Sequence, residues 1–178
     1  HSNILSHYIQ NIDSSNKVNG KPVYYLVNQQ DKQIPEDAGF VGIVNSQNIT
    51  AKNLTLTKNG QGILLAFSEN SKIENINISN NIDGILLHGT SNNSLINNTI
   101  LENGIGIYLL SGANNNFVDK NTISFHRYSI ENGGGVEKYG YGILLFGSGN
   151  NTLVNNTISE NDYGFLTMWW GTGNNKIY

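Results

Sequence analysis

The chain has 178 residues, 31 of them asparagine, with no cysteine and a formal net charge of -3. The lack of cysteine excludes disulfides. The small number of Lys and Arg residues argues against a nucleic-acid partner, because proteins that bind nucleic acids usually carry a stripe of basic residues. No apolar run is long enough to cross a membrane, so we expect no membrane insertion. The length favours a single domain.

Residues 1–40 follow no repeat and contain both prolines of the chain, Pro22 and Pro35. Within this segment, residues 23–27 (VYYLV) are β-branched or aromatic, which predicts a strand. We interpret 1–40 as an entry segment that caps the N-terminal end of the core. Such a cap is expected because an open end of stacked strands exposes unpaired edges.

From residue 41 onward one motif recurs, and it opens with a glycine followed by apolar residues at the first and third positions after it. The spacings between these glycines are 20, 22, 22, 36 and 22 residues, so the fourth gap is one repeat plus an insertion of 14. A fixed period indicates structural units that stack on one another. The opening residues are Gly42, Gly62, Gly84, Gly106, Gly142 and Gly164.

The runs between the polar turns are too short for helices, and the Asn, Gly, Thr and Ser of the turns are poor helix formers. We therefore predict an all-β fold, a right-handed single-stranded parallel β-helix of about six to seven coils of about 22 residues. In this organisation 1–40 is the entry and capping segment and 41–178 forms the coils. A Gly-rich loop inserted at 128–140 interrupts them.

Asparagine recurs in register, which predicts asparagine ladders along the stack. Asn tolerates the left-handed backbone of tight turns, and stacked amides bond the amides above and below. His126 falls in one of these columns and most simply replaces a turn asparagine. The two columns are Asn53, Asn75, Asn97 and Asn155, and Asn59, Asn81, Asn103 and Asn161.

The same asparagine-rich turns create seven N-x-Ser/Thr sequons, which are candidate glycosylation sites if the chain is secreted. They stand at Asn48, Asn53, Asn77, Asn92, Asn97, Asn150 and Asn155.

The repeat G-I-x-L-x-x-x-x-x-N-x-I-x-N-N-T-I-x-x-N resembles the parallel β-helix repeats of NosD-type proteins. It also resembles the carbohydrate-binding and sugar-hydrolysis (CASH) domains and archaeal surface proteins built from such repeats. Residues 11–31 followed by 37–66 resemble the NosD-type entry module. The resemblance implies a periplasmic or extracellular setting, but it leaves function open because lyases, epimerases, adhesins and structural proteins share the repeat.

Copper, the metal that the NosD resemblance implies, prefers clusters of His, Cys or Met. The chain has four His, one Met and no Cys, and His88 and His126 lie in different repeats and columns. Calcium needs clustered carboxylates, whereas those of the repeats are scattered. We therefore predict no metal and no cofactor, and a copper-handling periplasmic protein is the second alternative function.

A carbohydrate-active enzyme, such as a polysaccharide lyase, epimerase or hydrolase, is the first alternative. The region 126–141 has the densest group of chemistry-bearing side chains. Glycoside cleavage needs two carboxyls at a defined separation, and nothing in a Gly-rich loop fixes such a distance. The candidate catalytic residues of this alternative are His126, Arg127, Tyr128, Glu131 and Glu137.

If the first and third positions after each glycine point inward, the second and fourth point outward. These outward positions are apolar in most repeats, and a long exposed apolar stripe usually marks an interaction surface. The stripe is covered either by residues 1–40 or by a second copy of the chain. The predicted interface residues are Leu64, Leu86, Tyr108, Leu144, Leu166, Phe146, Trp169 and Trp170.

The sequence thus favours a non-enzymatic module of a cell-surface or periplasmic protein, with a structural or binding role. The expected partners are other copies of the chain or other surface-protein domains, with polysaccharide as a further candidate. The last repeat stops part-way, which favours a fragment of a longer protein or an end that stacks on another subunit.

Overall fold

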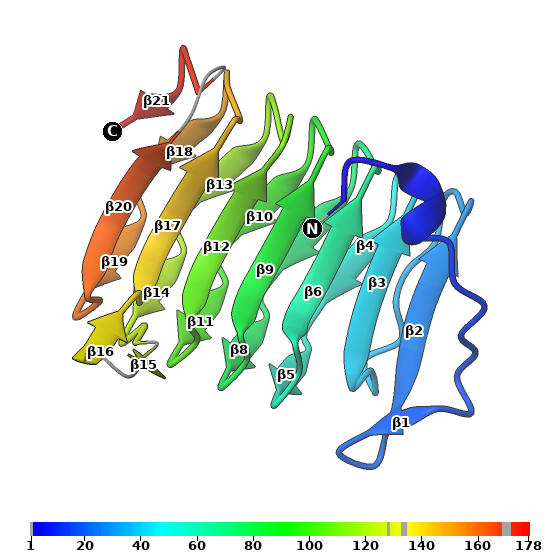
Figure 1. Ribbon diagram of the computed structural model, residues 1–178. Helices are drawn as coiled ribbons and strands as arrows, with labels where there is room; N and C mark the ends of the chain where they lie inside the picture. The colour runs from blue at the N-terminus through cyan, green and yellow to red at the C-terminus, as the bar shows by residue number, and fades with distance from the viewer. Residues whose placement is uncertain (1, 128, 133–134, 169–171) are drawn as a thin grey trace.

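The computed structural model describes residues 2–127, 129–132, 135–168 and 172–178. Its strands stack into an elongated solenoid, with the N-terminal coils at one end and the C-terminal coils at the other (Figure 1). Nearly all regular structure is strand, and the described helix is a short 3-10 turn, η1 (Leu5–His7). Within the described residues, no helix combines the length and apolarity needed to cross a membrane.

The largest sheet has eight strands, and all neighbours pair in parallel except β1 and β2, which are antiparallel. In sheet order its strands are β1 (Lys17–Val18), β2 (Lys21–Val27), β3 (Phe40–Val44), β6 (Gln61–Ala66), β9 (Asp83–His88), β12 (Ile105–Leu110), β17 (Tyr141–Phe146) and β20 (Tyr163–Met168).

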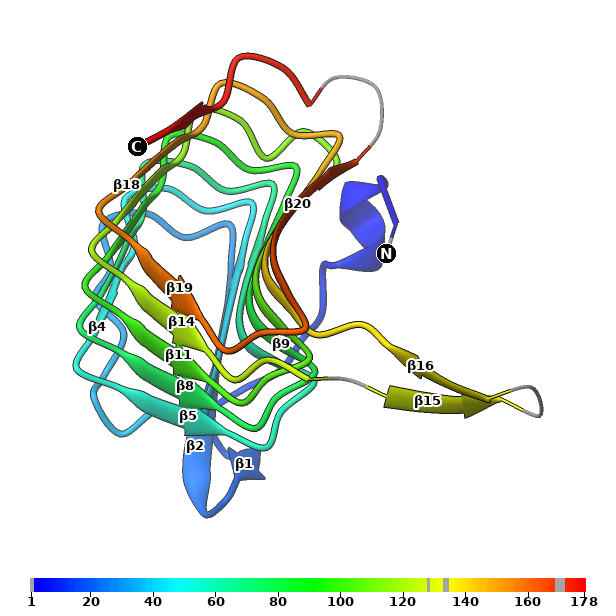
Figure 2. The same ribbon diagram turned by 90° about the vertical axis from the view of Figure 1, so that its left-hand side faces the viewer.

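Two further parallel sheets complete the wall of the solenoid (Figure 2). The six-stranded sheet contains β4 (Thr50–Lys52), β7 (Lys72–Glu74), β10 (Ser94–Ile96), β13 (Phe117–Asp119), β18 (Thr152–Val154) and β21 (Lys176–Ile177). The five-stranded sheet contains β5 (Thr55–Thr57), β8 (Asn77–Ser79), β11 (Thr99–Leu101), β14 (Thr122–Ser124) and β19 (Thr157–Ser159). Each complete coil supplies one strand to each sheet, which confirms the predicted all-β parallel β-helix.

The repeat register predicted from the glycine spacing is the register of the strands. Ile107 pairs with Ile85 and Leu109 pairs with Leu87 across β12 and β9. These four side chains have 0% exposure. The inward columns of successive coils therefore form one continuous apolar core.

The repeat glycines other than Gly164 are required because the coils pack closely where each long strand begins. A Cβ atom added at Gly84 would lie 2.7 Å from Ile100 Cγ2, and it would also contact the backbone oxygen of Gly106. The next coil cannot move away without loss of its ladder hydrogen bonds. Packing, rather than an unusual backbone angle, explains the glycine at this position.

Asparagine ladders run through the turns, as predicted. In the buried column, Asn81 Nδ2 donates to Asn103 Oδ1 at 2.9 Å. His126 continues the same column, because the Asn103 N–H donates to His126 Nδ1 and the His126 N–H donates to Asn161 Oδ1. The exposed column differs in role, since its members hold the left-handed conformation with φ between 53° and 56°; they are Asn53, Asn75, Asn97 and Asn155.

The N-terminal segment does two different things. Residues 17–27 form β1 and β2, so they extend the solenoid by a first coil. The preceding residues lie along the side of the solenoid, where η1 packs on the outer face of the eight-stranded sheet (Figure 2). Leu5 and Tyr8 there contact an apolar cluster that includes Val44, Leu64 and Leu86.

The insertion predicted as a loop contains an antiparallel hairpin, β15 (Ser129–Asn132) and β16 (Gly135–Lys138). It projects from the solenoid between the coils that carry β14 and β17, on the side of the eight-stranded sheet (Figure 2). The chain re-enters the solenoid after the hairpin, and Tyr141 then pairs with Ile105 at the start of β17.

Candidate functional site

The N-terminal segment of the chain covers the outer face of the eight-stranded sheet over the first coils of the solenoid. Leu64 and Leu86 are buried against Leu5 and Tyr8. Tyr25 Oη donates to the backbone oxygen of Tyr8 at 2.6 Å, which fixes the segment at this height. For these two members of the predicted stripe, the cover is therefore intramolecular.

Three rings hold the segment in place. Tyr8 stacks on His88 with ring centroids 5.3 Å apart, and Phe67 meets both rings edge-on at 5.7 and 5.5 Å. Aromatic pairs in these geometries each contribute about 0.5–1.5 kcal/mol beyond their buried area. The cluster therefore anchors the N-terminal segment to the coils of β6 and β9.

Further along the same face, a hollow of about 160 Å³ opens where β9, β12 and β17 begin. Its wall is mainly apolar and aromatic, and one carboxyl lines it. The lining residues are Ile82, Asp83, Gly104, Ile105, Tyr139 and Tyr141. We call this feature the Asp83–tyrosine hollow.

The aromatic surface continues past the hollow to the next coil. Tyr141 and Tyr163 stack with centroids 5.2 Å apart and an angle of 23° between the rings. Tyr163 is 52% exposed. Parallel strand pairing of β17 with β20 brings the two rings together, because Tyr141 and Tyr163 are direct partners in the ladder.

Asp83 is the unusual group of the hollow. It is 5% exposed, and it accepts a long hydrogen bond of 3.5 Å from Gln61 Nε2. Burial raises the pKa of the Asp83 carboxyl to about 6, and the Gln61 hydrogen bond opposes this rise. Burial, assisted by the charge of Asp83, also raises the pKa of Tyr108 on the neighbouring strand. A buried carboxyl with a raised pKa in a pocket makes Asp83 a candidate functional residue.

Comparison with known families gives a match over nearly the whole chain. The family described as periplasmic copper-binding protein (NosD) matches residues 8–178. The chain belongs to the NosD family. A comparison with curated proteins finds no match.

Two solved structures are similar to this NosD-family chain. A double mutant of the periplasmic alginate epimerase AlgG is 19% identical, with a TM-score of 0.48, and the match covers 88% of this chain and 39% of that chain. The A-module of the Azotobacter vinelandii mannuronan C-5 epimerase AlgE4 is 16% identical, with a TM-score of 0.33, over 85% and 58% of the two chains. The chain thus spans less than two thirds of either structure.

The described residues of this NosD-family chain do not fit a copper site. They contain no group of three or more His, Cys, Asp or Glu residues placed to hold a metal ion. His126 is 0% exposed and uses Nδ1 to accept the Asn103 N–H, while His88 is buried beneath the ring of Tyr8.

The residues of the enzyme alternative are not all brought together. His126 lies inside the asparagine ladder, so it has no contact with solvent, whereas Arg127 is exposed. Tyr128 lies outside the described residues, as do the side chains of Glu131 and Glu137 on the hairpin strands.

The sequence drew attention to the region 126–141 but missed its buried neighbour. Tyr141 lies within that region, whereas Asp83 is one of the scattered carboxylates of the repeats. One signal was available, because Asp83 stands directly before a repeat glycine, where the neighbouring coils have Gln61 and Ile105. A carboxylate in a column of larger uncharged residues indicates a special environment.

The remaining predicted residues fall into two groups. In the interface set, Leu144 is buried, Tyr108, Leu166 and Phe146 are half-buried, and Trp169 and Trp170 lie outside the described residues. Glycosylation stays a prediction, although all seven sequon asparagines are exposed: Asn48, Asn53, Asn77, Asn92, Asn97, Asn150 and Asn155.

Proposed function

We propose that this NosD-family chain is a non-enzymatic binding module that holds a polysaccharide on the outer face of its eight-stranded sheet, outside the cytoplasm. The observation that carries the proposal is the Asp83–tyrosine hollow, in which a buried carboxyl lies beside two tyrosines on an otherwise apolar wall. The family description, which names a periplasmic protein, supports the location.

The chemistry of the hollow suits a sugar chain. One face of a pyranose ring is lined by C–H groups and packs on an aromatic ring, while its hydroxyls donate to a carboxylate. The Tyr141–Tyr163 stack extends the aromatic surface along the solenoid axis. Successive coils rise by about 4.8 Å, which is comparable with the length of one sugar residue in an extended chain. A polysaccharide can therefore contact equivalent rows on successive coils.

Self-association is a weaker part of the same proposal. Met168 on β20 is 41% exposed, and Leu166 beside it is half-buried. An apolar patch at the last long strand supports contact with a second copy or with another surface-protein domain.

The expected result of a Tyr141→Ala substitution is a loss of polysaccharide affinity by about tenfold or more, because a central aromatic contact is removed. Affinity electrophoresis through gels that contain neutral and acidic polysaccharides measures the effect. Tyr178→Ala is the matched control, since Tyr178 is 79% exposed at the far end of the chain. Equal retardation of both variants and of the unmodified protein would contradict binding at the hollow.

A carbohydrate-active enzyme is the second candidate, and the raised pKa of Asp83 favours it, because an acid with a pKa of about 6 can exchange protons near neutral pH. Glycoside hydrolysis also needs a second carboxyl, and Asp83 is the carboxyl among the described residues that line the hollow.

For this candidate we expect that the unmodified protein leaves hexasaccharides of glucose, mannose and galacturonate intact and unepimerised, as measured by mass spectrometry and proton NMR. If the protein does convert one of them, and Asp83→Asn abolishes conversion while binding persists, the enzyme reading replaces the binding module.

A further inference from the structure

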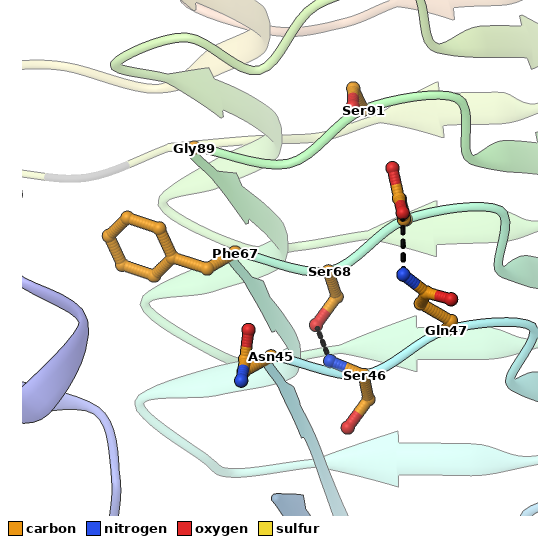
Figure 3. Close-up of a pocket in the computed structure, with 8 residues that line it drawn as sticks. Asn45, Ser46, Gln47, Phe67, Ser68, Gly89 and Ser91 are labelled. Atoms are coloured by element: carbon orange, nitrogen blue, oxygen red, sulfur yellow. Dashed lines mark hydrogen bonds between the residues drawn. The ribbon is translucent and has the colours of Figure 1, made fainter. Parts of the chain in front are cut away.

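A second depression lies at the opposite ends of the long strands, where β3, β6 and β9 turn toward the six-stranded sheet (Figure 3). It has a volume of about 280 Å³, close to the lower limit of ligand pockets. In contrast to the hollow, its surface is mainly polar, with one aromatic ring. We call it the turn notch, and its ligand-facing candidates are Gln47, Phe67, Glu69, Gly89 and Ser91.

The aromatic wall of the turn notch has an unusual backbone. Phe67 has φ of 51°, in the left-handed region, whereas the equivalent turns use Asn45 and Gly89. A bulky residue is unfavourable in this region, and such outliers are frequent at ligand sites. A Cβ atom at residue 89 would lie 3.2 Å from the Phe67 ring, so the glycine leaves room for the ring.

The ring is also fixed in orientation. The Phe67 ring is steeply inclined to the rings of Tyr8 and His88, so it is held between the N-terminal segment and the end of β9. The ring projects from the turn toward that segment, while the polar side chains of the notch follow along the same turns (Figure 3). A fixed ring loses little conformational freedom when a ligand packs against it.

Polar groups stand in a row on the other side of Ser68 from the Phe67 ring (Figure 3). Gln47, Glu69 and Ser91 are successive partners in parallel bridges, so each lies one coil from the next. Gln47 Nε2 donates to Glu69 Oε1 at 2.6 Å, so Gln47 Oε1 and Glu69 Oε2 take no part in this bond. By contrast, Ser68 Oγ is committed to the backbone oxygens of Ile43 and Ala66.

We infer that the turn notch is a second carbohydrate subsite, which binds two adjoining neutral sugar units. The Phe67 ring packs on the C–H face of one unit, and Gln47, Glu69 and Ser91 bond the hydroxyls of the next. The described residues that line the notch include a carboxylate but no cation, so a uronate would be repelled. The inference does not depend on the Asp83–tyrosine hollow, which lies at the other ends of the strands.

The test uses NMR titration of the full chain with cellohexaose, mannohexaose and hexagalacturonate. In a Tyr141→Ala background, which removes the hollow, we expect a neutral hexasaccharide to bind still and to shift the amide signals of residues 67–69 and 89–91. Glu69→Ala in that background should weaken this binding by about tenfold. Glu102→Ala is the matched control, because Glu102 is an exposed carboxylate in another turn.

Two further variants separate binding from structure. Glu69→Gln keeps a hydrogen-bonding side chain beside Gln47 and should retain most of the affinity. Tyr8→Ala releases the edge of the Phe67 ring without a change in the polar row, and it should weaken binding less than Glu69→Ala. Equal affinities of Glu69→Ala and Glu102→Ala would overturn the inference, as would tighter binding of hexagalacturonate than of either neutral probe.

Discussion

An Asn121→Leu substitution is expected to lower the free energy of unfolding by about 4–6 kcal/mol. Asn121 is 1% exposed, and its Oδ1 accepts both the N–H and the Nδ2 of Asn98, each at 2.9 Å. Its Nδ2 donates to the backbone oxygens of Leu95 and Asp119. Leucine has a similar shape but removes all four hydrogen bonds. Asn98 Nδ2 keeps its bond to the Ile73 oxygen and the Asp119 oxygen keeps that from the Asn97 N–H, whereas each buried group left without a partner costs about 1–3 kcal/mol.

Urea unfolding at neutral pH, followed by circular dichroism, measures this loss. Asn77→Leu is the matched control, because Asn77 is exposed on β8. The control should change the free energy of unfolding by less than about 0.5 kcal/mol. If both variants lower the free energy of unfolding by the same amount, the buried amides do not hold the coils together.

The second large effect concerns His126 and acid. Burial lowers the pKa of His126 from 6.5 to about 4, and hydrogen bonds to the backbone of Asn103 and Ile100 oppose this change. Between these two values the unfolded chain binds a proton that the folded chain does not. Stability from the neutral ring is therefore present at neutral pH and is lost as the pH falls, by about 3 kcal/mol in all.

Asp83 acts in the opposite direction over the same range. Its folded pKa is raised from 3.8 to about 6, so the folded chain binds a proton that the unfolded chain lacks, and stability rises as the pH falls. The two groups offset one another, and the unmodified protein should have a nearly flat profile between pH 4 and 6.5.

His126→Asn isolates the histidine, since asparagine is the residue of this ladder column in neighbouring coils. At pH 7 we expect the free energy of unfolding of the variant to lie within about 1 kcal/mol of that of the unmodified protein. At pH 4 the free energy of unfolding of His126→Asn should be about 3 kcal/mol higher than that of the unmodified protein, because the Asp83 contribution is common to both proteins. A constant difference between the two unfolding profiles from pH 7 to pH 4 would show that burial of His126 does not perturb its pKa.

The fold was predictable because the spacing of the repeats in the sequence determines which residues pair between neighbouring coils. Ile85 and Ile107 stand one position after their glycines, and the strands pair them as the spacing requires. The substitution of His126 into an asparagine column was also visible. Two further buried ladders were not singled out, although Asn98 and Asn121 recur with the same period and bond one another.

The candidate site was less predictable, since it depends on contacts between segments without periodicity. The sequence leaves open whether residues 1–40 or a second copy of the chain cover the apolar stripe, and because Leu5 and Tyr8 belong to no repeat, their contacts with Leu64 and Leu86 could not be predicted. The carboxyl of Asp83 is unusual only after the coils have stacked and buried it. The tyrosines at 139–141 join it because the hairpin returns the chain to the start of β17.

The most direct measurement is an NMR titration of the unmodified protein with a polysaccharide fragment that gel retardation has identified as a ligand. Binding on the outer face of the eight-stranded sheet predicts that the largest amide shifts fall at residues 82–83, 104–105 and 139–141, with smaller shifts near 163. Shifts confined to the outer surfaces of the five- and six-stranded sheets, or no shifts with any neutral or acidic fragment, would contradict polysaccharide binding on the eight-stranded sheet.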